Sequence, residues 1–320
     1  MRYRGFGSIP WKVSALGLGC TRLPVRSGGF DSVDVDETEA RRMIRHAIDS
    51  GVNYVDTAYD SHGGQGEQVL GRVLCEGYRA RVHIATKLPL RLIEAPDDFD
   101  CILGEQLKRL QTDSIDCYLF YAANCKNWCD AVLRHGLMEK AAAALADGRI
   151  GSLGFSFQGD FSSQNDLQIF EEILKGSNLW SFCQFELNYL NAPLHMAFHD
   201  LSMVADLGLG VVATDPMKGG RLVNPPAEIR QAMEEFPLER TPTEWALEWL
   251  WDLPELSVVL CEMNSAEHLE ESLRLARQAH PHCFGTKDQA LIEKLREGYS
   301  AHTPIAPVGG CSCGICLGRA

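Results

Sequence analysis

The sequence lacks an excess of basic residues and any long apolar run, and both absences limit its partners. Its 320 residues include 30 Lys and Arg against 43 Asp and Glu, which gives a formal net charge of −13. Such a balance repels phosphate backbones and anionic lipid headgroups, so we expect no nucleic-acid partner. No apolar segment approaches the roughly 20 residues that a membrane-spanning helix needs. We therefore expect a soluble, cytoplasmic protein without a membrane partner, whose oligomeric state the sequence leaves open.

The sequence also lacks features that would divide the chain or indicate an open sheet. No linker, composition shift or low-complexity tract separates one part from another. A doubly wound sheet usually carries a Gly-rich dinucleotide fingerprint after its first strand. The corresponding stretch here, "GLGCTRLP", has neither that spacing nor a helix behind it. What recurs instead is an alternation of short apolar runs with helical segments.

Eight apolar runs are spaced as the strands of parallel βαβ units. Helical apolar spacing predicts a helix over 37–51, ending at Gly51, and another over 130–148, ending at Gly148. Eight such units closing in order predict an α/β fold, a (β/α)8 TIM barrel over residues 1–302. A β-hairpin in "MRYRGFGSIPWKVS" is expected to cover its floor. The predicted strands are 16–19, 52–56, 82–86, 115–120, 150–155, 182–186, 210–213 and 257–260.

Three polar residues end neighbouring predicted strands. Asp56 ends the second strand, Lys87 the third, and Tyr121 follows the fourth. Because the carboxyl ends of barrel strands meet at one mouth, we expect these side chains to converge there. A carboxylate beside a buried ammonium keeps it charged and oriented. A catalytic pair and a plain buried ion pair both remain open, since structural pairs also perturb pKa values.

Twelve cysteines are scattered along the chain, and most are expected to be reduced core thiols. The exception is the tail, residues 303–320, where thiols cluster at Cys311, Cys313 and Cys316. Three thiolates could bind an iron–sulfur cluster or zinc, both of which prefer four protein ligands. The alternative is a frayed tail of free thiols. The candidates for a fourth ligand are Cys125, Cys129 and Cys283.

Six segments resemble, in order, the successive motifs of the aldo-keto reductase superfamily. They are "GVNYVDTAY" with the "GE" that follows it, "ATK", "RLQTDSIDCYLF", "GRIGSLGFSF", "CQFELNYLN" and "DPMKGGRL", and they span essentially the whole chain. The tail is similar to that of a bacterial branch whose members end in a ferredoxin-like cysteine motif. The resemblance implies an oxidoreductase that transfers hydride between a nicotinamide and a small carbonyl or alcohol. It also implies a catalytic tetrad of Asp, Tyr, Lys and His.

Two tetrad positions match the family and two do not. Its Asp matches Asp56 and its Lys matches Lys87, but its Tyr position is Ser61 and its His position is Tyr121. A serine hydroxyl is a far weaker acid than a phenol, so the proton needs another donor. Tyr121 beside Lys87, or His62 beside Ser61, could supply it. The alternative is a barrel without reductase activity, which binds a nucleotide or catalyses a dehydration or isomerisation.

The resemblance also implies a nucleotide pocket. Ser156 and Gln184 match positions that hold the nicotinamide carboxamide, and Asn264 and Ser265 open a helix whose free N–H groups suit a phosphate. Acidic residues in "CEMNSAEHLEES" would repel the 2′-phosphate of NADPH, which favours NADH over NADPH. The other implied cofactor contacts are Gly19, Cys20, Thr21, Thr214, Met217, Lys218, Gly219 and Glu271.

Overall fold

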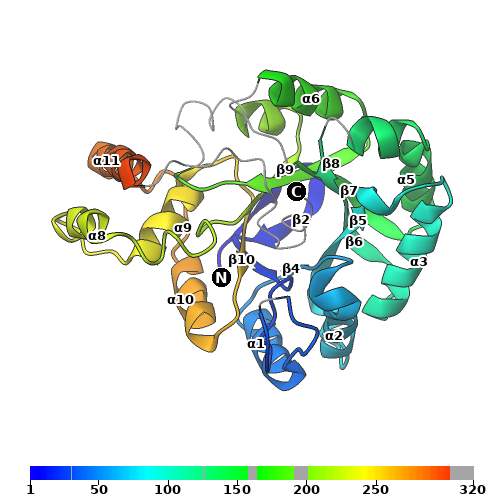
Figure 1. Ribbon diagram of the computed structural model, residues 1–320, viewed down its shortest axis with the longest axis horizontal. Coiled ribbons are helices and arrows are strands. Elements are labelled where there is room, and N and C mark those ends of the chain that lie inside the picture. The colour runs from blue at the N-terminus through cyan, green and yellow to red at the C-terminus, as the bar shows by residue number, and fades with distance from the viewer. Residues whose placement is uncertain (30, 125–126, 158–163, 191–200, 303–320) are drawn as a thin grey trace.

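A closed barrel of eight parallel strands forms the centre of the computed structural model (Figure 1). The structure describes residues 1–302 except 30, 125–126, 158–163 and 191–200. All eight predicted strands are present and pair in the order β10-β3-β4-β5-β6-β7-β8-β9, which confirms the predicted barrel. The strands are β3 (Leu16–Gly19), β4 (Tyr54–Asp56), β5 (His83–Pro89), β6 (Ile115–Ala123), β7 (Ile150–Phe157), β8 (Trp180–Glu186), β9 (Gly210–Thr214) and β10 (Val258–Glu262).

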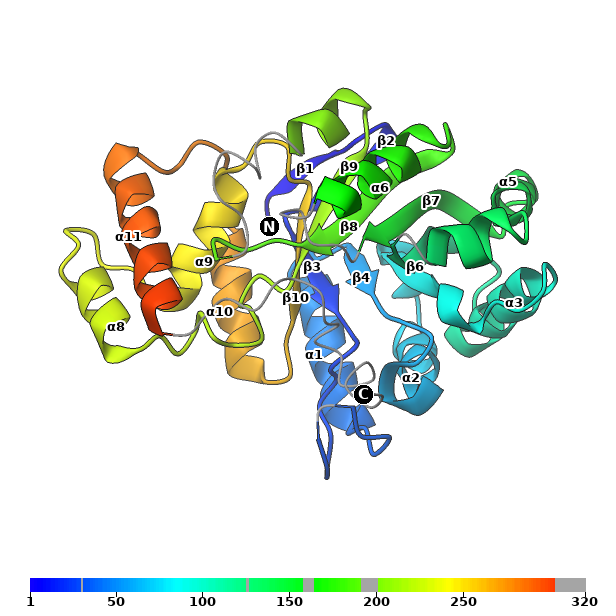
Figure 2. The ribbon, with the colours of Figure 1, turned by 45° about the horizontal axis from the view of Figure 1, so that its top comes forward.

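Helices surround the strands on the outside of the barrel (Figure 1). Figures 1 and 2 both show the last of them, α11, beside α8. Across the described ranges, no helix is long and apolar enough to cross a membrane. The helices are α1 (Glu37–Asp49), α2 (Gln65–Val73), α3 (Asp98–Leu110), α5 (Leu137–Ala146), α6 (Gln164–Lys175), α8 (Ala227–Glu234), α9 (Pro242–Asp252), α10 (Ala266–Ala276) and α11 (Thr286–His302). Short helical segments are η1 (Ser61–Gly64), η2 (Arg79–Arg81), η3 (Leu90–Leu92) and η4 (Trp128–Leu133).

Helix α1 begins and ends as the sequence predicts. The Asp36 side chain caps it by accepting a hydrogen bond from the Glu39 N–H at 3.2 Å. Gly51, with a φ of 99°, ends the segment in a conformation that favours glycine. The single helix predicted over 130–148 is wrong. It is divided into η4 and α5 at Gly136, whose φ of 61° lies in the left-handed region.

The predicted hairpin is also present, as β1 (Tyr3–Phe6) and β2 (Ile9–Ser14). Phe6, Ile9 and Val13 are buried in one cluster with the side chains that fill the barrel. The Phe6 ring contacts the Phe182 ring at 5.4 Å between centroids. The hairpin therefore covers the amino-terminal end of the strands and leaves the carboxyl-terminal end for the site.

Candidate active site

The alternation of strand residues places a ring of polar side chains at the barrel mouth. Side chains of Tyr54, Ala85 and Leu119 fill the interior, and the next inward position on each strand lies two residues further on. Those positions are Asp56, Lys87 and Tyr121. The same step from Phe182, Val212 and Leu260 leads to Gln184, Thr214 and Glu262, and Ser156 pairs in register with Gln184. The structure thus brings the predicted strand-end residues to one mouth.

Asp56 and Lys87 form a buried ion pair at this mouth. Lys87 Nζ donates to Asp56 Oδ1 at 2.5 Å and to the Thr57 carbonyl at 2.7 Å. Burial raises the pKa of Asp56 above its usual value, and the Lys87 ammonium opposes that rise. The second oxygen, Asp56 Oδ2, is buried and has no hydrogen-bond partner among the described residues. The predicted pairing is confirmed, and it leaves one carboxylate oxygen for a further donor.

Tyr121 follows Leu119 by two residues on β6, where the β6–β7 register is irregular between Phe120 and Ala123. Lys87 lies opposite Leu119, and Tyr121 lies opposite Pro89 in the β5–β6 register. With strands about 4.8 Å apart and a rise of about 3.3 Å per residue, the Cα atoms of Lys87 and Tyr121 are roughly 8 Å apart. That separation is within the combined reach of the two long side chains. Tyr121 is half-buried, so its side chain can contact both the interior and the mouth.

Ser61 and His62 lie in η1, directly after β4. Ser61 is nearly buried and packs so closely on Gly66 of α2 that a Cβ there would lie 2.7 Å from the Ser61 Cβ. His62 is 1% exposed. Its Nε2 accepts from the Leu23 N–H at 2.9 Å, and its Nδ1 lies 2.7 Å from the Ser32 carbonyl. A carbonyl accepts, so Nδ1 carries the proton. A proton-donor role for His62 would therefore require one of these bonds to break.

Two residues at the mouth fit the carboxamide of a nicotinamide. Gln184 is 4% exposed, and its Oε1 is buried without a partner in the described part of the chain. Ser156, paired with it in register, is 6% exposed. An unpartnered buried amide oxygen is costly unless a ligand donates to it. The amide hydrogens of a carboxamide would satisfy it, so these two side chains fit the group that the sequence implies.

The loop after β3 is tied to the end of β10. Thr21 Oγ1 donates to Glu262 Oε1, and Arg22 Nε lies 2.8 Å from Glu262 Oε2. A Cβ on Gly19 would lie 2.8 Å from the Glu262 Cγ. Both carboxylate oxygens of Glu262 therefore contact residues of this loop. Side chains alternate along a strand, and Gly19 occupies an inward position. The Cys20 side chain therefore lies on the outer side of the barrel.

The loop after β9 is held by acids as well. Lys218 Nζ lies 3.3 Å from Glu186 Oε2, across from Thr214 at the end of the strand. Asp215 Oδ1 accepts from the Gly219 N–H at 2.6 Å, and Asp215 and Lys218 both have a φ of 48°. Left-handed conformations at non-glycine residues store strain, which is typical of functional loops. Met217 packs against the main core beside this loop.

The predicted phosphate-binding helix begins where the sequence places it. Ser265 Oγ accepts from the His268 N–H at 3.3 Å and caps α10, and Asn264 directly before it is exposed. Two acidic residues of this segment contact different helices or loops. Glu270 pairs with His46 of α1 at 2.6 Å, and Glu271 accepts from Thr241 Oγ1 at 3.0 Å.

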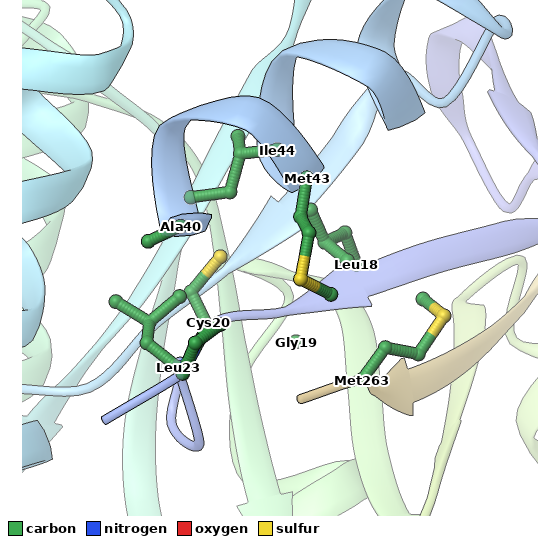
Figure 3. A pocket seen from close by; sticks show the side chains of 9 residues that line it. Leu18, Gly19, Cys20, Leu23, Ala40, Met43, Ile44 and Met263 are labelled. Atoms are coloured by element: carbon green, nitrogen blue, oxygen red, sulfur yellow. The ribbon is translucent and has the colours of Figure 1, made fainter. Parts of the chain in front are cut away.

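An apolar cavity lies on the outer side of β3 (Figure 3). Its volume is about 10 Å³, and its lining includes Cys20, Met43 and Met263. A space of that size holds at most one water molecule. Burial raises the pKa of the Cys20 thiol well above its usual value, so this sulfur stays protonated. The cavity is therefore part of the core rather than a ligand site.

Sequence reasoning missed a buried polar network behind the mouth. Glu67 of α2 is fully buried and contacts Thr86, Gln106 and Arg109. The only sequence signal was the "GE" that ends the first family-like motif. A carboxylate next to a glycine gives no indication of burial by itself.

No cluster of three or more metal-ligating side chains occurs within the described ranges. Cys311, Cys313 and Cys316 lie outside them, as does Cys125. Of the proposed fourth ligands, Cys129 is exposed. Cys283 is half-buried, and its thiol donates to the Glu248 carbonyl at 3.7 Å.

Comparison with known proteins gives consistent results. Residues 15–281 match the model of the aldo/keto reductase family. The chain is 24% identical over 307 residues to the uncharacterized oxidoreductase YqkF of Bacillus subtilis (strain 168), covering 86% of this chain and 91% of that protein. It is 29% identical over 172 residues to the aldo-keto reductase YhdN of the same organism, covering 49% and 47%. Its fold is similar to that of the aldo-keto reductase AKR11C1 from Bacillus halodurans in its holo form, with a TM-score of 0.74, 24% identity and coverage of 92% and 96%.

The closed (β/α)8 barrel carries a buried acid–lysine pair at its mouth and, among the described residues, a buried Gln184 amide oxygen without a partner. With the family model matching most of its length, the chain belongs to the aldo/keto reductase family. It is an oxidoreductase of the aldo-keto reductase type, and its cofactor is a nicotinamide nucleotide.

Proposed function

We propose that this protein transfers hydride between a nicotinamide nucleotide and a small polar carbonyl or alcohol, with Tyr121 in place of the usual proton donor. The observation that carries the proposal is the β5–β6 register, which places Tyr121 two residues beyond Leu119, the residue opposite Lys87. The usual tyrosine position is occupied by Ser61, whose side chain carries an aliphatic hydroxyl instead of a phenol. A phenol is the stronger acid of the two, so Tyr121 is the better donor.

Different residues of the chain would bind the nicotinamide, position the lysine and transfer the proton. A nicotinamide supplies or accepts the hydride, and Gln184 and Ser156 would hold its carboxamide. Asp56 holds the Lys87 ammonium in place by accepting its hydrogen bond. An ammonium next to a phenol stabilises the phenolate and so eases proton transfer. Tyr121 then donates its proton to the substrate oxygen in reduction and accepts it back in oxidation.

NADH is the cofactor that we favour over NADPH. Glu262 and Glu267 are exposed around the N-terminus of α10, where a nucleotide phosphate would lie. Arg22, in the loop after β3, already pairs with Glu262. These charges disfavour an additional 2′-phosphate. The ratio of the dissociation constants for NADH and NADPH, measured by fluorescence titration, tests this preference.

We also propose that Cys311, Cys313 and Cys316 bind an iron–sulfur cluster or zinc. Their spacing supports it, since three thiolates occur within six residues. The eight described cysteines form no disulfide, which supports a reducing compartment such as the cytoplasm.

Replacing Tyr121 with Phe tests the proton donor because it removes only the hydroxyl. We expect turnover to fall by about 10²- to 10⁴-fold while nucleotide affinity changes little. Lys87→Met should be at least as damaging. The measurement is steady-state NADH oxidation with a panel of small aldehydes and ketones, together with a nucleotide titration of each variant.

Two outcomes would contradict the proposal. If Tyr121→Phe turns over normally while Lys87→Met is inactive, the phenol is not the donor, and His62 or a bound water takes its place. If the parent protein oxidises neither nucleotide with any carbonyl, the reductase activity itself must be abandoned. Ser61→Tyr, which restores the usual residue, serves as a matched variant, because only a decayed reductase would gain activity from it.

A further inference from the structure

A carboxylate with no solvent exposure lies directly behind the acid–lysine pair. Glu67 Oε1 accepts from Thr86 Oγ1 at 2.8 Å and from Gln106 Nε2 at 2.7 Å. Its Oε2 lies 3.3 Å from Arg109 Nη1. We call Glu67, Thr86, Gln106 and Arg109 the Glu67 network. Burial raises the pKa of Glu67, and its hydrogen bonds and Arg109 oppose that rise.

One side of the Glu67 network holds the strand that carries Lys87. Gln106 Nε2 donates to the Lys87 carbonyl at 3.1 Å, and Thr86 is the residue before it. Tyr118 donates its hydroxyl to Gln106 Oε1 at 2.8 Å, which fixes the amide with its NH₂ group toward Glu67 and Lys87. The end of β5 is thus held from outside the barrel at the lysine itself.

The other side of the network holds the loop that follows Asp56. Arg109 Nη1 donates to the Tyr59 carbonyl at 3.0 Å, and the guanidinium lies 4.3 Å from the centre of the Tyr59 ring. The Tyr59 hydroxyl donates to Glu105 at 2.6 Å. This loop also contains Thr57. Through Thr86 on one side and Arg109 on the other, Glu67 therefore connects the end of β5 to the loop after β4. The Thr57 N–H, which donates to the Ala85 carbonyl, and the Arg91–Asp60 ion pair connect the same parts of the chain.

The position of the Lys87 ammonium depends on both of these segments. Its backbone belongs to β5, but its two acceptors, Asp56 Oδ1 and the Thr57 carbonyl, belong to β4 and its loop. An ammonium has three N–H donors. Two of these N–H groups donate to fixed acceptors, so the tetrahedral geometry of the ammonium sets the direction of the third. A shift of a catalytic group by about 1 Å can lower the rate roughly 10²-fold.

We propose that Glu67 is a positioning residue, which aligns the Lys87 ammonium with the reacting groups by locking the β4 loop to the end of β5. The inference rests on the proposed function for its kinetic readout but not for its structural one. A buried ion pair is by itself weak evidence of a gain in stability. The contacts that Glu67 and its partners make on both sides of the Lys87 ammonium support alignment instead.

Two substitutions at one position separate alignment from stability. Glu67→Gln keeps an Oε1 acceptor for Thr86 and Gln106, whereas Glu67→Leu removes it. We expect Glu67→Leu to lower kcat by about 10- to 100-fold with the nucleotide dissociation constant changed less than about threefold. Glu67→Gln should stay close to the parent. Hydrogen exchange of the amides in 57–64 should accelerate in Glu67→Leu and not in Glu67→Gln.

Arg79→Met is the matched control at the opposite end of the barrel. Arg79 pairs with Asp116 at 2.7 Å and donates to the Ser114 carbonyl, away from the mouth. It should lower the melting temperature without changing kcat. If Glu67→Leu also lowers only the melting temperature, the network merely supports the fold and the proposal is overturned.

The remaining outcomes also decide the proposal. If Glu67→Leu does not fold, Gln106→Leu replaces it, because that change removes the donor to the Lys87 carbonyl and keeps the carboxylate. If the parent protein turns over no carbonyl, the proposed function fails. Hydrogen exchange then still decides whether Glu67 orders the loop: acceleration supports the proposal and unchanged exchange overturns it.

Discussion

At the scale of single residues, the mouth is built from acids whose partners are cations at a neighbouring strand end or in a loop that follows a strand. Asp56 pairs with Lys87, Glu186 with Lys218 and Glu262 with Arg22. Asp215 differs, because its described side-chain hydrogen bond comes from the backbone N–H of Gly219. A backbone donor compensates a buried carboxylate less than an ammonium does. Burial is the largest cause that raises the pKa of Asp215, and the Gly219 N–H opposes that rise.

Replacing Asp215 with Asn should stabilise the protein at pH 7 but not at pH 4. Burial raises the pKa of Asp215 from 3.8 to about 6. The folded state therefore holds its proton more tightly than the unfolded chain, so parent stability falls as the pH rises from about 4 to 6. The asparagine oxygen still accepts from Gly219. We expect a gain in the free energy of unfolding on the order of 1 to 3 kcal/mol at pH 7, measured by urea denaturation.

The exposed Glu239→Gln is the control for that series, because it removes a carboxylate that is not buried. A difference between Asp215→Asn and the parent that stays constant from pH 4 to pH 7 would show that Asp215 ionises alike in the folded and unfolded chains.

Some residues of this site were predictable from the sequence, and others were not. Asp56 and Lys87 end neighbouring parallel strands, whose carboxyl ends necessarily meet, so strand order alone predicts their contact. Glu67 bonds to Thr86 and Gln106 across 19 and 39 residues. Such side-chain contacts between a helix and its neighbours leave no periodic pattern. The Gln184 oxygen, which has no partner among the described residues, likewise depends on packing.

At the scale of elements, the barrel strands were predictable because parallel strands are buried on both faces and read as short apolar runs. The break at Gly136 was not, because apolar spacing continues across it and only the positive φ ends the helix. The end of α9 was not predictable either, because its hydrogen bonds come from a residue far away in the sequence. The Trp251 carbonyl in its last turn and two carbonyls just beyond it accept hydrogen bonds from Arg4 of β1, near the start of the chain.

Replacing Arg4 with Met should destabilise the fold by about 3 kcal/mol, because it leaves several buried carbonyls without a donor. Arg4 donates to the Leu253 and Leu256 carbonyls, both at 2.9 Å, and to the Trp251 carbonyl. Its burial lowers its own pKa to about 10, so the charge is retained at neutral pH. Thermal and urea unfolding measure the loss.

Arg2→Met is the control for Arg4, since Arg2 makes one exposed bond to the Arg277 carbonyl at 3.3 Å. An equal loss from both substitutions would mean that the hairpin charge, rather than the cap on α9, stabilises the fold.

At the scale of the whole molecule, the barrel and the tail are expected to be separable. The family match ends at residue 281, and the barrel strands and hairpin form one connected core. Metal sites need their ligands deprotonated and close together, and three of the four proposed ligands belong to the tail. Loss of the tail's metal should therefore leave the barrel intact.

Protein purified without oxygen should carry iron or zinc in near-stoichiometric amount, measured by elemental analysis. Cys313→Ser removes one of three clustered thiolates and should abolish that metal. The melting temperature of the barrel should not change, because the described strands and helices of the barrel lie within residues 1–302. Cys101→Ser, on the exposed face of α3, is the matched control and should retain the metal.

Cys129→Ser and Cys283→Ser then identify the fourth ligand by metal loss. If neither metal is present in the parent protein under these conditions, the three thiols are free and the metal proposal fails, while the barrel's reductase activity is untouched by that result.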